Sequence, residues 1–262
     1  MSILEIIVFL PLLAALAIGM GAPARFTALS TSMLVLIMSL VSAIQFSTSI
    51  EGTLQMVSTR PLLELAGFPS LSLSFGLDGI SLVMLLLSAI VMVAAVLVSP
   101  KEAELERHPR LYYLSLLLIG GGALGAFCST DLFFLYAFHE LALIPTFLMI
   151  GIFGAGSDRL KTAWTITIYL GVGSLVLLVG LILAVSGLGG STFNIEELTA
   201  LAIENPMTSQ MQNWVFFLLL VGFGILVSLF GIAHVEECIV CSVSPPLLGV
   251  VALRATPLSF PL

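Results

Sequence analysis

The chain has 262 residues, of which 59% are hydrophobic and 9% are charged, and its formal net charge is −7. So few charges cannot cover the surface of a soluble protein of this length, and with a mean hydropathy of +1.20 they predict a polytopic membrane protein. The acidic balance and the lack of a basic cluster exclude a nucleic-acid partner.

Seven apolar stretches are long enough to cross a bilayer, whose core of about 30 Å needs about 20 helical residues. They are predicted at residues 3–20, 26–46, 78–98, 111–129, 131–153, 163–188 and 214–232. Because the stretches are continuously apolar, they predict helices and exclude a strand barrel. The predicted fold class is all-α and polytopic, with about seven transmembrane helices.

The first stretch has two interpretations. The small residues 21–24 follow it, as they do in a cleaved signal peptide, but residues 1–5 contain Glu5 and no Lys or Arg. A signal peptide begins with positive charge, so we expect a retained transmembrane helix.

Cations gather in the loops after the first, third and fifth stretches. These loops contain Arg25, Lys101, Arg107, Arg110, Arg159 and Lys161. The loops after the second, fourth and sixth stretches contain Arg60 alone. The positive-inside rule therefore predicts a cytoplasmic side at the first set of loops and an amino terminus outside, and we expect a bacterial cytoplasmic membrane.

Residues 71–75 alternate between apolar and polar side chains, which predicts a short strand or hairpin between the second and third stretches. Asp78 follows and is expected to cap the third helix. The polar segments 101–110 and 189–213 are predicted to be surface loops, the second with a short amphipathic turn.

Residues 128–131 alone join the fourth and fifth stretches, so these two helices are predicted to be antiparallel neighbours. Asp131 or Thr130 is expected to cap the fifth helix, and a proton site is the alternative role for Asp131. Four glycines of the fourth stretch permit close helix packing: Gly120, Gly121, Gly122 and Gly125.

Glu140 lies in the middle of the fifth stretch, and residues 131–151 contain no Lys or Arg. A charge at that depth is costly in lipid and is typical of a polar path lined by protein. His139 titrates close to physiological pH, and Pro145 is expected to break the helix beside the carboxylate. We therefore predict that Glu140 and His139 form a proton-translocation site. The alternatives are an acid that only bonds a neighbouring helix, and a histidine that only packs.

The sequence predicts no cofactor or metal site in this chain. Cys128 lies in an apolar stretch, while Cys238 and Cys241 form an isolated pair without clustered histidines. Neither a dinucleotide-binding glycine motif nor a phosphate loop occurs in the sequence. Electron or nucleotide chemistry is therefore expected in other subunits.

Three segments carry a resemblance to a known family. They are Leu77-Asp78-Gly79-Ile80-Ser81-Leu82, the run from Asp131 through His139, Glu140 and Pro145 to Gly154, and the set Arg159, Tyr169, Gly173, Ser174 and Leu175. Over residues 1–230 the chain resembles the antiporter-like subunits of respiratory complex I, most closely the group of subunit M of bacterial NADH-quinone oxidoreductase, called chain 4 in mitochondria.

The resemblance implies about fourteen spans in two inverted repeats, with residues 1–230 as the amino-terminal half. It implies a membrane-arm subunit of the NADH:quinone oxidoreductase enzyme, in which proton translocation is coupled to quinone reduction. Its partners would be other membrane-arm subunits and the lipid bilayer, and NADH, FMN, iron–sulfur clusters and quinone would lie in partner subunits. Glu140 matches the family's fifth-span glutamate, whereas Leu226 stands where a lysine is expected.

Other interpretations remain open. A cation/proton antiporter subunit or a membrane-bound hydrogenase subunit would share this fold and the fifth-span glutamate. A structural or assembly subunit that moves no ions would explain Leu226, and Glu140 beside Pro145 argues against it.

Residues 231–262 depart from the family's pattern. They contain two of the three cysteines and four of the twelve prolines, and they include His234. We expect a shifted reading frame or a misassigned gene end near Phe230, with a genuine short paralogue as the alternative. No function is assigned to this tail.

Overall fold

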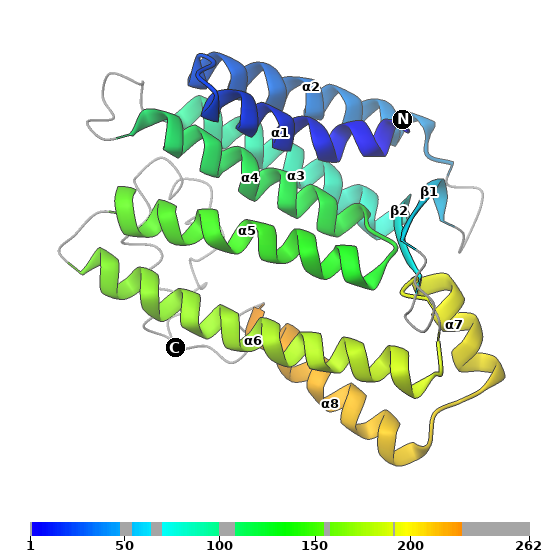
Figure 1. The fold of residues 1–262 in the computed structure, drawn as a ribbon. Coiled ribbons are helices and arrows are strands. Elements are labelled where there is room, and N and C mark those ends of the chain that lie inside the picture. Colours follow the sequence, from blue (N-terminus) through cyan, green and yellow to red (C-terminus); the bar gives the residue numbers. More distant parts are fainter. Residues whose placement is uncertain are drawn as a thin grey trace, which may run out of the picture.

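The computed structural model describes residues 2–47, 54–63, 70–99, 108–154, 158–190 and 192–226. In these residues the chain forms eight helices and two strands (Figure 1). The elements are α1 (Ile3–Gly19), α2 (Ala24–Gln45), β1 (Gln55–Leu63), β2 (Leu71–Leu77), α3 (Gly79–Val98), α4 (Pro109–Cys128), α5 (Leu132–Phe153), α6 (Arg159–Gly187), α7 (Ile195–Glu204) and α8 (Ser209–Leu226).

Six of these helices, α2 to α6 and α8, are long and apolar enough to cross a membrane. The helix α1 is also apolar, and its 17 residues extend over about 26 Å. A helix lies at each of the seven predicted stretches, so the all-α polytopic fold class is confirmed.

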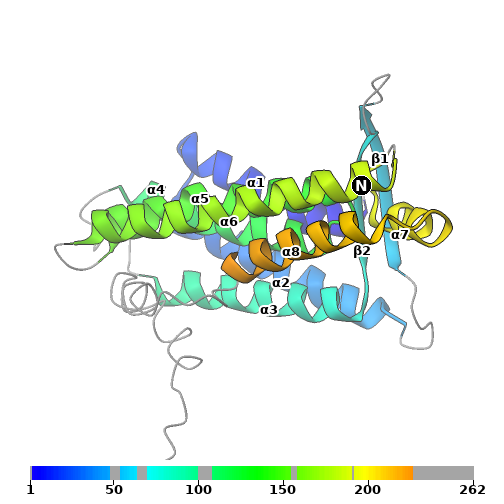
Figure 2. The same cartoon turned by 90° about the horizontal axis from the view of Figure 1, so that it is seen from below.

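The helix α4 lies at the centre of the amino-terminal group of helices. α1, α3 and α5 each pack against it, while α2 packs against α1 and α3. Figure 1 shows α5 between this group and the pair of α6 and α8, and Figure 2 shows the strands and α7 together at one end of the bundle. The fully buried side chains at the centre include Leu4, Ile7, Tyr112, Tyr113 and Leu117.

Two glycines bring α4 and α5 close together. A Cβ atom at Gly122 would lie 2.8 Å from the Phe138 carbonyl oxygen, and one at Gly125 would lie 2.5 Å from the Phe138 ring. A larger residue would push the helices apart, so the predicted role of these glycines in close packing is confirmed, as is the pairing of the two helices.

An antiparallel hairpin of β1 and β2 covers one end of the bundle, with Thr59 opposite Ser74. The predicted strand at residues 71–75 lies within β2. Asp78 follows and caps α3, because its Oδ1 accepts a hydrogen bond from the Ser81 amide (2.6 Å). The same backbone hydrogen bond lowers the pKa of Asp78.

Residues 195–204 form the helix α7, which is longer than the short amphipathic turn that the sequence predicts. The Asn194 side chain accepts hydrogen bonds from the amides of Glu196 (2.9 Å) and Glu197 (3.4 Å). This cap and the two acids in the first turn favour helix formation at its positive end. The prediction was wrong because the preceding Gly189 and Gly190 are a strong loop signal.

A hydrogen-bonded ion pair ties the hairpin to α1. Glu5, whose side chain is 3% exposed, accepts hydrogen bonds from Arg60 Nε (2.7 Å) and Arg60 Nη2 (3.0 Å). The Ser58 hydroxyl donates to the same carboxylate (2.7 Å). Glu5 also closes a capping box with Ser2 at the start of α1. The sequence gives no local sign of this pair, because its members lie on different elements.

Some predictions concern residues outside the described part of the chain. They include the cations Lys101 and Arg107, the residues Cys238 and Cys241, and the whole tail 231–262.

Candidate proton-translocation site

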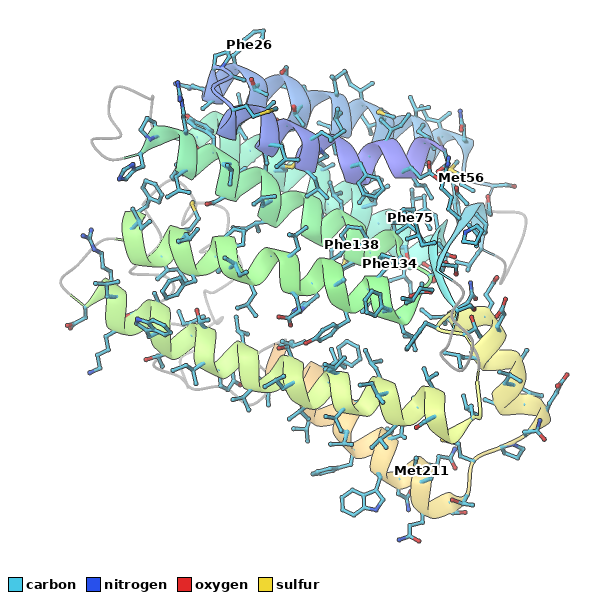
Figure 3. All side chains as sticks on the ribbon, viewed as in Figure 1. Phe26, Met56, Phe75, Phe134, Phe138 and Met211 are labelled. Carbon is cyan, nitrogen blue, oxygen red and sulfur yellow. The ribbon has the colours of Figure 1, made fainter. Side chains whose placement is uncertain are left out.

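The helix α5 positions the predicted site residues. It begins after Asp131, whose Oδ1 accepts hydrogen bonds from the amides of Phe133 (2.9 Å) and Phe134 (3.2 Å), so the predicted cap is confirmed. The Phe138 ring packs against Gly125 of α4, and its centre lies 6.0 Å from the ring centre of Phe75 in β2 (Figure 3). Residues two apart on a helix point about 200° apart. Glu140 therefore lies on the opposite face of α5 from Phe138, toward α6.

Glu140 and His139 form the polar centre of this face. His139 Nδ1 lies 3.7 Å from Glu140 Oε1, and the two side chains are 34% and 35% exposed. Both of these atoms are buried, and neither has a hydrogen-bond partner among the described residues. Their positions on the helix predict that only one side chain reaches a given interface, but the two turn toward each other. A buried carboxylate oxygen without a partner is costly, so the site is suited to a proton, a water molecule or a further polar group.

Tyr136 extends this site toward α6. It lies one turn before Glu140 on the same face of α5, and its hydroxyl interacts with Glu140 and with Ser174. Ser174 is 2% exposed and donates a hydrogen bond to the Gly171 carbonyl (3.0 Å). Tyr136 is a site residue that the sequence analysis missed. Its spacing of four residues from Glu140 is the signal that could have found it.

Pro145 lies inside α5, and the helix continues on both sides of it. The proline ring removes the amide that would bond the Leu141 carbonyl, next to Glu140 in the chain. The Thr146 hydroxyl donates to the Ala142 carbonyl (2.7 Å) on the same stretch. The helix break at Pro145 stays a prediction.

Asp131 is a second buried acid, at the hairpin end of α5. It is 0% exposed, and its Oδ2 has no hydrogen-bond partner among the residues that the structure describes. Burial raises the pKa of Asp131, while the amides of Phe134 and Phe133 oppose this effect. Nine residues, or about 13 Å of helix, separate it from Glu140, so the two acids do not share one site.

The helix α8 packs closely on α6 beside Ser174. A Cβ atom at Gly222 would lie 2.8 Å from Leu177 Cα, and the neighbouring Gly173 faces Ile225. Leu226, where the resemblance leads one to expect a lysine, follows Ile225 at the described end of α8. α8 contains no Lys or Arg between Ser209 and Leu226. Within the described ranges, His139 in its protonated form is the cation that lies beside Glu140.

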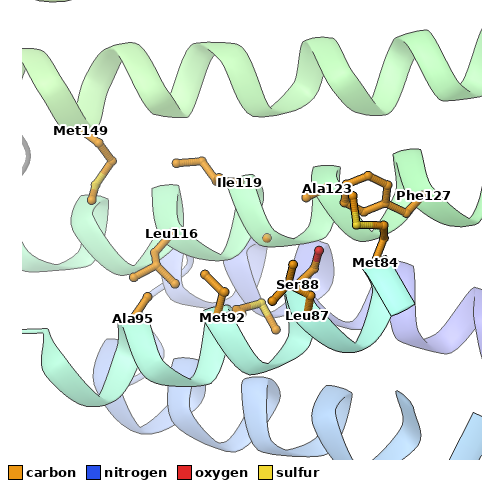
Figure 4. A pocket seen from close by; sticks show the side chains of 12 residues that line it. Met84, Leu87, Ser88, Met92, Ala95, Leu116, Ile119, Ala123, Phe127 and Met149 are labelled. Carbon is orange, nitrogen blue, oxygen red and sulfur yellow. The ribbon is translucent and has the colours of Figure 1, made fainter. Parts of the chain in front are cut away.

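A cavity of about 330 Å³ lies elsewhere, between α3, α4 and α5 (Figure 4). Its walls are apolar, with Ser88 as the polar exception, and they include neither Glu140 nor His139. Its lining contains no acidic or basic side chain, so it is not the site of proton chemistry.

The potential metal ligands are dispersed within the described part of the chain. In that part of the chain, no three His, Cys, Asp or Glu residues lie close enough together to hold a metal. Cys128 is buried and free, while Cys238 and Cys241 lie outside the described residues.

The fold and the site together define a class: a multi-pass helical membrane subunit with an acid and a histidine inside one membrane-spanning helix. Residues 129–234 match the family model described as NADH:quinone oxidoreductase/Mrp antiporter, TM. This match, together with the relatives described next, confirms the predicted resemblance.

Larger parts of the chain are similar to curated proteins and to a solved structure. It is 31% identical over 209 residues to NADH-quinone oxidoreductase subunit M of Escherichia coli, covering 76% of this chain and 39% of that protein. It is 30% identical over 237 residues to NAD(P)H-quinone oxidoreductase chain 4 2 of Thermosynechococcus vestitus, covering 87% and 42%. A chain of respiratory complex I from Thermus thermophilus with bound NADH superimposes with a TM-score of 0.78 at 28% identity, covering 96% of this chain and 50% of that one. This chain thus spans about two fifths of the length of these curated relatives.

Proposed function

We propose that this chain is a membrane-arm subunit of an NADH-quinone oxidoreductase and that it contributes to proton translocation coupled to quinone reduction. The observation that carries the proposal is Glu140 Oε1 inside α5, which is buried and has no hydrogen-bond partner among the described residues, with His139 Nδ1 3.7 Å away. A carboxylate in this position has a reason to bind a proton, because the neutral form avoids an unpaired charge inside the membrane.

In this mechanism Glu140 and His139 exchange a proton with water that enters the polar site. Glu140 takes up a proton on its free carboxylate oxygen and becomes neutral. His139 supplies or accepts the proton at Nδ1, so the pair carries one proton between two neighbouring atoms. Tyr136 and Ser174 continue the route for the proton toward α6, since their hydroxyls can both donate and accept hydrogen bonds.

The oxidoreductase chemistry is assigned to partner subunits in this proposal. NADH, FMN, iron–sulfur clusters and quinone would bind there, and their reactions would change the surroundings of Glu140 through contacts between subunits. The proposed partners are therefore other membrane-arm subunits of the complex, in addition to lipid. The relatives named above support this assignment, since each is a subunit of an oxidoreductase complex by name.

The proposed location is a bacterial cytoplasmic membrane with the amino terminus outside. The described cations Arg25, Arg110, Arg159 and Lys161 lie at the starts of α2, α4 and α6. Figure 1 shows these three helix starts at the same end of the bundle, opposite the hairpin that carries Arg60. This distribution supports a cytoplasmic face at the cation-rich end.

The test replaces Glu140 with Gln in the chain assembled in its native membrane. Inverted vesicles are supplied with NADH, and proton uptake and NADH oxidation are followed in parallel. We expect proton uptake per NADH to fall at least several-fold, because Gln cannot exchange a proton. Glu196→Gln on α7, at an exposed acid, is the matched control and leaves the ratio unchanged.

An unchanged ratio in an assembled Glu140→Gln complex would overturn the proposal and favour a structural subunit. The family model also names the Mrp antiporter, which supports a second candidate function, a cation/proton antiporter. That candidate predicts sodium-driven proton movement without NADH in the same vesicles.

A further inference from the structure

An apolar groove runs along α4, which forms its floor, with α3 and α5 as its walls (Figure 4). We call it the α3–α5 groove. Met84 and Met92 of α3, Phe127 of α4 and Met149 of α5 are among its lining residues. These helices are all candidate membrane spans, so the groove lies at membrane depth.

The dimensions of the groove restrict what it can hold. It extends from Met84 to Ala95 along α3, a rise of about 16 Å over eleven residues. The centre of a water molecule can occupy about 330 Å³ of the groove, so over this length the free width, with the radius of a water molecule added on each side, is about 8 Å. A helix with its side chains is about 10–12 Å wide. The body of a transmembrane helix therefore cannot lie inside the groove, whereas a hydrocarbon chain can.

The lining also suits a flexible apolar chain. Ser88 is the one polar side chain among the lining residues. The three methionines can adapt their shape to a ligand. Gly120 leaves space for Met92. A Cβ atom at Gly120 would lie 2.5 Å from Met92 Sδ, so glycine lets Met92 pack against the backbone of α4.

One end of the groove points toward the cation-rich end of the bundle. Ala95 and Leu116 lie there, near the end of α3 and the start of α4. The exposed residues His108 and Arg110 lie further along at the start of α4, about 9 Å from Leu116 along the axis in the case of Arg110. Basic residues at this level attract lipid phosphate groups. The opposite end reaches Met84 and Phe127.

We propose that the α3–α5 groove binds one acyl chain of a membrane phospholipid, whose headgroup lies at the level of Arg110. The width admits an unbranched hydrocarbon chain, the lining matches its chemistry, and the cations determine the end from which it enters. This inference is independent of whether Glu140 carries protons.

The test uses the full chain in liposomes of phosphatidylcholine and phosphatidylglycerol that contain phosphatidylcholine with a photoactivatable diazirine in one acyl chain. After illumination, labelled peptides are identified by mass spectrometry. We expect labelling of the groove residues of α3 and α4 to exceed that of the outer face of α6 at least several-fold. Ala123→Phe fills the groove and should reduce the groove signal to the level of α6. Val179→Phe adds the same ring at an exposed position of α6, outside the groove, and should leave the groove signal unchanged.

If Ala123→Phe does not accumulate in the membrane, Ser88→Leu enlarges another lining residue and gives the same comparison. Equal labelling of the groove and of α6 overturns the proposal. A groove signal that survives in the filled variant also overturns it.

Discussion

Glu5→Gln tests whether the ion pair between α1 and β1 holds the hairpin in place. The carboxylate accepts two hydrogen bonds from Arg60, at 2.7 and 3.0 Å, and one from Ser58 at 2.7 Å. The substitution keeps the shape of the side chain but removes its charge and turns an amide NH₂ toward the donors of Arg60.

Hydrogen bonds to charged groups each contribute about 1.5–3 kcal/mol. Arg60 is 53% exposed, so water replaces part of the hydrogen bonding that its guanidinium loses in the variant. We therefore expect a net loss of about 2 kcal/mol in the free energy of opening the hairpin, which corresponds to a roughly 30-fold change in the equilibrium.

Hydrogen exchange in lipid nanodiscs, followed by mass spectrometry, measures this opening. Protection of β1, β2 and the first turn of α1 should fall about 30-fold in Glu5→Gln, while protection of α5 and α6 is unchanged. Arg60→Gln should have a similar effect, and the double variant should lose little more than either single variant. A change below threefold, or additive losses in the double variant, would refute the reasoning.

Three further predictions concern packing and titration. Gly122→Ala should destabilise the bundle by about 1–3 kcal/mol through overpacking against Phe138. Gly171→Ala is the control and should not destabilise it, because a Cβ atom there would meet nothing within 4 Å. Thermal unfolding of the two purified variants compares them. Burial raises the pKa of Asp131, so the native state favours the protonated form of this side chain. The protein should therefore lose stability as the pH rises from about 4 through the raised pKa. Asp131→Asn can still cap α5 and should remove this pH dependence of the free energy of unfolding. The pKa of Asp78 is lowered instead, so its contribution is present above about pH 4 and is lost on acidification; Asp78→Ala should cost about 1 kcal/mol at neutral pH, and an equal cost at pH 3 would contradict this assignment.

The membrane-spanning helices are predictable from the sequence because their signal is local. Each apolar stretch must satisfy its own backbone hydrogen bonds in lipid, which leaves the helix as the solution for continuously apolar segments. The caps Asp78 and Asp131 are predictable for the same reason, because each side chain bonds amides two or three residues ahead.

The contacts between distant segments are not predictable in this way. The pairing of Glu5 with Arg60 joins residues 55 positions apart, and no periodicity relates them. Tyr136 and Ser174 meet only because α5 and α6 pack side by side. Glu140 itself was predictable, since an acid in an apolar stretch stands out, but the approach of His139 to its carboxylate depends on side-chain conformations that the sequence leaves open.

Backbone hydrogen bonds fix the hairpin end of α5 to two segments far away in the chain. The Thr130 amide donates to the Ser74 carbonyl (3.0 Å), and the Leu132 amide donates to the Phe193 carbonyl (3.0 Å). These bonds hold the first residues of α5 in place. Pro145 lies about 20 Å along the helix from this end, and about 12 Å of helix follows it. A rotation of about 10° at Pro145 displaces the far end of α5 by about 2 Å. Glu140 lies between the held end and Pro145, so it keeps its position.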